Sequence, residues 1–145
     1  MKGIAALLSL AALAALAVGP LQAGAGSPAP SAAALKNGKA IFLSGHDHSG
    51  VKITAATPPL RASCAACHGA FGAGGVHLPG GAVSADLRHA AMSSGKHPYT
   101  LALIERAIST GVDNDGEALN RVMPRWKLSQ RDLHDVAEYV LTQLR

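Results

Sequence analysis

Aromatic side chains are scarce in this chain of 145 residues, which has two Phe, two Tyr and a single Trp. A small domain without large side chains has difficulty filling a hydrophobic core. We therefore expect the core to take part of its apolar bulk from another source, such as a buried cofactor.

Cysteines are few and basic residues are scattered. Only two cysteines are present, so no second pair is available to complete a structural zinc site. Lys and Arg occur singly along the chain, and the formal net charge is a mild +4. No nucleic-acid partner is expected without a dense basic patch, whereas a mildly basic surface favours docking to an acidic protein.

The N-terminus has the pattern of an export signal. Lys2 precedes an apolar run over residues 4–18, and the small residues Ala23-Gly24-Ala25 follow the run. The run is shorter than the roughly 20 residues that a membrane-spanning helix needs, although an uncleaved anchor is the alternative. We predict a signal peptide over 1–25, a flexible linker over 26–31, one domain over 32–145, and no stable membrane insertion after cleavage.

The hydrophobic pattern predicts helices joined by long loops. The chain has no internal repeat and no run of strands long enough for a sheet, so we expect an all-α domain. Ser31, Thr100 and Ser129 each precede an apolar-periodic segment as an N-cap would. The predicted elements are helices at 32–43, 85–92 (with Ser84 as the cap), 101–110 and after Ser129, a helical turn at 64–68, and a short β-like stretch at 51–54.

The pentad Cys64-Ala65-Ala66-Cys67-His68 is the attachment signature of a c-type haem. On a short helical turn, Cys64 and Cys67 lie on one face and can reach the two vinyl groups of a porphyrin. His68 then points its imidazole at the iron, a metal that this ring binds well. A dithiol redox motif or half of a zinc site are the alternatives for the Cys pair.

A methionine offers a second ligand to the iron. Met123 lies in a loop that can wrap to the opposite side of the ring, and Pro124 stiffens the chain after it. Met92 is the fallback. The remaining candidates are histidines for which a surface or loop position is the better interpretation: His77, His89, His97 and His134.

The chain resembles the class I c-type cytochromes, and within them a subgroup of small monohaem periplasmic cytochromes of bacteria. The motifs that carry the resemblance cover nearly all of residues 32–145 and occur in the family's order. They are Gly38-Lys39-Ala40-Ile41-Phe42, the pentad with Gly69, Pro98-Tyr99-Thr100, Gly111-Val112-Asp113-Asn114-Asp115-Gly116, and Met123-Pro124 followed by Leu128-Ser129.

The resemblance implies a small all-α cytochrome c fold with crossing N- and C-terminal helices, a central haem and long loops. Gly38 and Phe42 would mark the crossing, near Val136, Tyr139 and Val140. One haem c would be bound covalently through Cys64 and Cys67, with His68 and Met123 as iron ligands. The carbonyl of Pro79 would accept a hydrogen bond from His68, and Trp126, Arg125 and Tyr99 would surround the haem propionates.

The function implied is electron transfer in the periplasm by a monomer that exchanges electrons with a donor and an acceptor protein and is not an enzyme. The basic side chains of Lys52, Arg61, Lys96, Arg125 and Lys127 could steer acidic partners. A haem enzyme or gas sensor would need an open or displaceable sixth site for a ligand such as peroxide or NO. A haem-free thiol–disulfide oxidoreductase would need a βαβ setting, which the sequence does not indicate.

Two further motifs suggest metal sites. His46-Asp47-His48 could bind copper or zinc, but a solvated loop is the simpler interpretation. The acidic stretch 113–117 resembles the start of a calcium loop, but Ala118 and Pro124 stand where an EF-hand requires Gly and Glu. We therefore interpret it as a turn.

Overall fold

The computed structural model describes residues 29–145, so the predicted signal peptide and positions 26–28 of the linker lie outside the described residues. No helix within 29–145 is long and apolar enough to cross a membrane. The elements are α1 (Ala32–Ser44), β1 (Thr54–Ala55), α2 (Ala65–His68), the 3-10 turn η1 (Pro79–Gly81), α3 (His89–Met92), α4 (Leu101–Thr110), β2 (Trp126–Lys127) and α5 (Gln130–Gln143).

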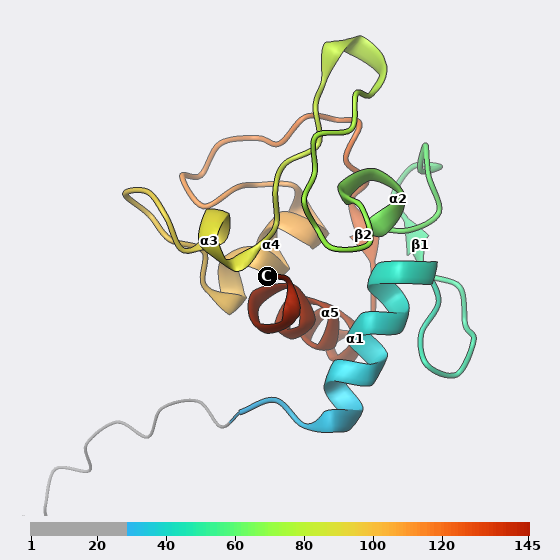
Figure 1. The fold of residues 1–145 in the computed structure, drawn as a ribbon. Coiled ribbons are helices and arrows are strands. Elements are labelled where there is room, and N and C mark those ends of the chain that lie inside the picture. Colours follow the sequence, from blue (N-terminus) through green and yellow to red (C-terminus); the bar gives the residue numbers. More distant parts are fainter. Residues whose placement is uncertain (1–28) are drawn as a thin grey trace, which may run out of the picture.

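The first and last helices pack across each other, as predicted (Figure 1). Gly38 makes the close approach possible, because a Cβ at this position would overlap the backbone of Asp135. One turn further along α1, the rings of Phe42 and Tyr139 lie 5.5 Å apart between centroids. Phe42 and Val136 are almost fully buried here, so the crossing forms the centre of the hydrophobic core.

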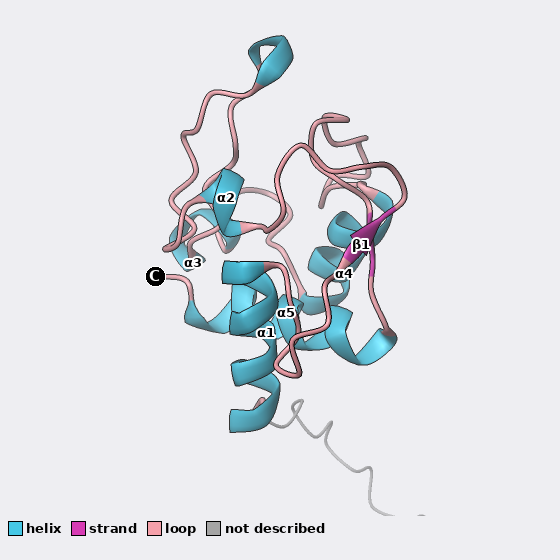
Figure 2. Ribbon diagram, turned by 90° about the vertical axis from the view of Figure 1, so that its right-hand side faces the viewer, coloured by secondary structure: helices cyan, strands magenta, loops and turns pink. Residues whose placement is uncertain are grey.

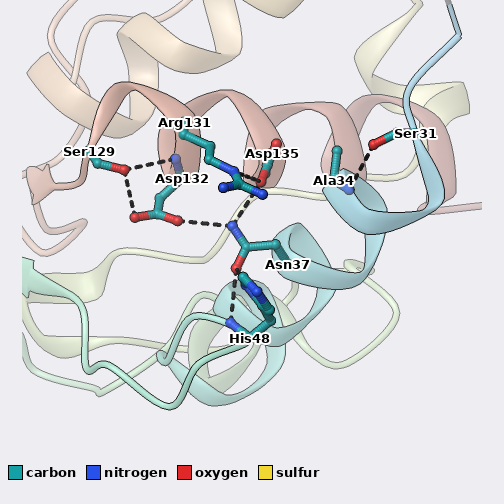
Figure 3. A network of polar contacts seen from close by, with 8 residues as sticks. All are labelled: Ser31, Ala34, Asn37, His48, Ser129, Arg131, Asp132 and Asp135. Atoms are coloured by element: carbon teal, nitrogen blue, oxygen red, sulfur yellow. Dashed lines mark hydrogen bonds and ion pairs between the residues drawn. The ribbon is translucent and has the colours of Figure 1, made fainter.

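A polar network joins the same two helices beside this apolar contact (Figure 3). The Asn37 Nδ2 group donates to Asp132 Oδ1 at 2.9 Å and to Asp135 Oδ2 at 2.8 Å. Its Oδ1 accepts from the backbone N–H of His48 at 2.9 Å. Asn37 and Asp135 are buried, and each needs its partners because an unpaired buried polar group is costly. The network therefore fixes the 46–50 loop to the helix crossing.

The predicted N-caps of the three long helices are correct. Ser31 accepts from Ala34 N, Thr100 from Leu103 N, and Ser129 from Asp132 N. The predicted helix at 85–92 is wrong in its first half, because α3 begins only at His89. Ser84 does not cap it; its Oγ accepts from Val76 N, and residues 85–87 have no regular secondary structure.

Within residues 29–145, β structure is limited to short pairings. The β-like stretch expected at 51–54 becomes β1 at Thr54–Ala55, which pairs antiparallel with β2 in the register Thr54 to Lys127 and Ala55 to Trp126. A second ribbon is closed by a bridge between His77 and Val83. The turn η1 forms the tip of this ribbon, which projects from the helical body in both views (Figures 1 and 2).

Candidate functional site

A cavity opens between α2, α4, α5 and the segment that carries Met123. Most of its lining is apolar, and the buried side chains come from elements far apart in the sequence. The larger aliphatic and aromatic members of the lining are Phe42, Leu78, Val83, Leu87, Tyr99, Ile104, Ile108, Leu119, Val122, Trp126, Val136 and Val140. Such a cavity suits a large, flat, apolar group.

One wall of the cavity is the helical turn that carries the pentad, where Cys64 is the N-cap of α2. Ser63 Oγ accepts from Ala66 N at 3.3 Å and supports the start of this turn. Cys64 and Cys67 both line the cavity, and neither forms a disulfide. Burial raises the pKa of the Cys64 thiol to about 12, so this sulfur is a neutral thiol in the protein alone.

The imidazole of His68 is held in one orientation by a backbone carbonyl. Its Nδ1 lies 2.9 Å from Ala85 O, and a carbonyl only accepts, so Nδ1 is the nitrogen that carries the proton. Burial lowers the pKa of His68, which favours the neutral ring. The Nε2 lone pair is then available to a metal, the arrangement that metal-binding histidines generally adopt.

The prediction that the Pro79 carbonyl accepts this hydrogen bond is therefore wrong. Pro79 is exposed in η1, at the tip of the projecting ribbon, and is not among the residues that line the cavity. The ribbon leaves the pentad and returns to it: Gly75 N donates to Ser84 O at 2.8 Å. Leu87 N then donates to Gly72 O at 2.7 Å, which brings Ala85 rather than Pro79 beside His68.

Met123 lines the same cavity from a different segment. Asn120 shapes this segment, since its backbone O accepts from Met123 N at 3.1 Å and its side-chain Oδ1 accepts from Val122 N at 3.0 Å. Met92, the fallback ligand, also lines the cavity and is buried. The structure thus brings both thioethers into the cavity that holds Cys64, Cys67 and His68.

Trp126 and Tyr99 line the cavity as well, and Trp126 is buried in β2. Arg125, which was predicted beside them, is not part of the lining; its guanidinium donates to backbone carbonyls instead.

The four histidines His77, His89, His97 and His134 are exposed and do not line the cavity either. Two of them pair with carboxylates, His97 with Asp115 and His134 with Glu105.

The two candidate metal motifs form local turns. Asp47 Oδ1 accepts from the N–H groups of Ser49 and Val51, and Asp113 Oδ1 accepts from those of Asp115 and Glu117. Across residues 29–145 no group of three or more His, Cys, Asp or Glu side chains is arranged to hold a metal ion. Both motifs are explained by the turns that they stabilise.

The family model described as Cytochrome c matches residues 35–143. The chain belongs to the cytochrome c family. Searches of curated proteins and of solved structures found no match. Members of this family bind haem c covalently through a cysteine pair, and Cys64 and Cys67 form that pair here. The helix crossing of α1 and α5 agrees with the family's fold.

The residues of the cavity fit haem c. Cys64 and Cys67 are free thiols on one turn, as thioether attachment requires, and His68 presents a neutral nitrogen ligand from the same turn. The apolar lining suits the porphyrin plane, and Met123 supplies a sulfur from another segment. Sequence reasoning missed Ala85, because this residue acts through its backbone carbonyl and so has no signature. Arg125 was expected at the propionates, but it binds backbone carbonyls outside the cavity lining.

Proposed function

We propose that the chain is an electron carrier of the periplasm, with one haem c whose iron is held by His68 and Met123. The observation that carries the proposal is the shared cavity: Met123 lines it together with Cys64, Cys67 and His68. When bound, the haem supplies an iron that gains and loses one electron. The family is one of electron-transfer proteins, which agrees with this role.

The chain's own residues would keep the iron site unchanged during electron exchange. Ala85 O fixes the His68 ring, and the buried side chains of Ile104, Ile108 and Val136 exclude water from the cavity. A thioether ligand favours the reduced ion, so His/Met ligation gives a higher reduction potential than two imidazoles. Rigid ligands also keep the reorganisation that accompanies electron transfer small.

The absorption spectrum of the purified protein in both redox states tests this proposal. We expect a covalent c-type spectrum with a methionine–iron charge-transfer band in the ferric state. Met123→Leu should abolish the band, and Met92→Leu is the matched control because Met92 lines the same cavity. A band that disappears in Met92→Leu and persists in Met123→Leu would assign the ligand to Met92, and a high-spin wild type would favour an enzyme or sensor.

Export is the second part of the proposal. The apolar run over 4–18 and the small residues that follow it support removal of the first 25 residues, and cytochromes of this family are typically exported. Redox proteins of the same compartment would then be the donor and the acceptor. The N-terminal sequence of the protein purified from its native host should begin at Gly26.

A further inference from the structure

Arg125 lies two residues after Met123, and its side chain points into the backbone of the surrounding loop. Nη1 donates to Met123 O at 2.5 Å and to Asn120 O at 3.2 Å. Nη2 donates to Leu119 O at 2.8 Å and to Gly111 O at 3.3 Å. One guanidinium thus joins four backbone carbonyls of the 111–123 segment, and Arg125 is half-buried among them.

Gly111 provides the space for this guanidinium. It is the C-cap of α4 in the left-handed conformation, with φ of 71°, and a Cβ there would overlap the Arg125 guanidinium. Its carbonyl oxygen also accepts from Leu119 N at 2.8 Å, which closes the base of the loop. A cation near the C-terminus of a helix is favoured by the helix dipole. Arg125 therefore fastens the loop to the end of α4.

α4 is a firm anchor because it also forms part of the cavity wall. Ile104, Ala107 and Ile108 are buried on its inner face, and all of them line the cavity. A contact that fixes the loop to α4 therefore also fixes the Met123 sulfur relative to the cavity. Within residues 29–145, Arg125 forms no ion pair with a carboxylate. Its guanidinium is held by the four hydrogen bonds to backbone carbonyls.

We propose that Arg125 is a positioning residue that holds the 111–123 loop closed and so keeps the Met123 thioether directed at the iron. The inference rests on the proposed ligation by Met123. Lysine cannot replace arginine here, because its single ammonium lacks the planar fork that reaches carbonyls on two sides. Without the Arg125 guanidinium, the loop shifts toward open arrangements in which Met123 leaves the iron. An external ligand that competes with Met123 for the iron then binds more tightly.

The experiment uses imidazole as a competing ligand for the ferric iron of the haem-loaded protein. Loss of the methionine–iron charge-transfer band is titrated in the wild type, Arg125→Met, Arg125→Lys and Arg121→Met. Arg121 is the matched control, since it lies in the same chain segment, is exposed and loses the same charge. Both Arg125 variants should bind imidazole about tenfold more tightly than the wild type, and Arg121→Met within about twofold of it.

The possible outcomes separate the two proposals. A wild type without the methionine band overturns the ligation by Met123 and the role of Arg125 with it. A wild type that has the band, with an Arg125→Met affinity equal to that of Arg121→Met, overturns the role of Arg125 alone. If Arg125→Met does not retain haem, Arg125→Lys decides: an imidazole affinity like that of the wild type contradicts the proposal, and a tighter one supports it.

Discussion

Asn37 shows how one amide can satisfy several partners at a buried contact. Its nitrogen donates to two carboxylates of α5 and its oxygen accepts from His48 N, so the orientation of the amide is fixed by its neighbours. Asp135 is 4% exposed, and Arg131 approaches it only to 3.8 Å. The buried carboxylate therefore depends mainly on Asn37.

Replacing Asn37 with Ala should lower the free energy of unfolding of the haem-loaded protein by about 2–3 kcal/mol, because Asp135 would stay buried without its amide donor. Urea unfolding followed by circular dichroism measures the change. Lys36→Ala, an exposed neighbour on α1, is the control and should stay within about 0.5 kcal/mol of the wild type. Equal stabilities of the two variants would show that the network contributes little.

The sequence singled out four side chains that the structure places together in one cavity, whereas it did not identify the backbone carbonyl beside His68. Cys64, Cys67, His68 and Met123 could be singled out because thiols, imidazole and thioether have few alternatives as haem ligands. The carbonyl that orients His68 could come from any residue type. Its assignment to Pro79 failed because the ribbon over residues 75–84 moves Pro79 away and returns the chain at Ala85.

At the scale of elements, the close crossing of α1 and α5 depends on a missing side chain. Gly38 costs about 1 kcal/mol of helix propensity relative to Ala. The structure gives the reason for tolerating it, since Asp135 O and Tyr139 Cβ occupy the space where a methyl group would lie. Propensity and packing therefore have opposite effects at this position.

Gly38→Ala should destabilise the folded protein by about 2–4 kcal/mol despite its better helix propensity, because the two helices must move apart. The urea midpoint of the haem-loaded protein is the measurement. Lys39→Ala introduces the same residue at the next, exposed position and should leave the midpoint nearly unchanged. A more stable Gly38→Ala protein would mean that the crossing adjusts at no cost.

The long helices were also the elements that the sequence predicted best. Each of α1, α4 and α5 has a polar N-cap and an apolar face, and both signals are local. The start of α3 was misplaced because Ser84 binds Val76 of the ribbon, a partner that no local pattern indicates. The pairing of β1 with β2 likewise joins segments that are distant in the sequence.

For the whole molecule, the charge around the cavity would influence how the proposed redox partners approach. Arg61 is exposed and borders the cavity, and among the described residues it is the one Lys or Arg of the lining. Arg125, expected to contribute to the same surface, is bound to carbonyls of its own loop. The proposed steering of acidic partners therefore relies on Arg61 more than the sequence suggested.

Oxidation of the ferrous protein by the hexacyanoferrate(III) anion should slow as the salt concentration rises, because added ions screen the attraction. Arg61→Glu should slow the reaction at low salt by about threefold and weaken its salt dependence. Lys36→Glu makes the same change of charge on α1, away from the cavity lining, and should have a smaller effect. Stopped-flow kinetics over a range of ionic strengths decide, and rates independent of salt would exclude electrostatic steering.

The tip of the projecting ribbon is a suitable site for inserting a peptide. Its tip at Gly80 and Gly81 has open space around it, while Leu78, Ala82 and Val83 of the same ribbon line the cavity. Exposed tips of this kind tolerate inserted peptides. A surface-binding peptide grafted between the two glycines would hold the protein on an electrode by the segment that borders its redox centre, with the orientation set by the fold.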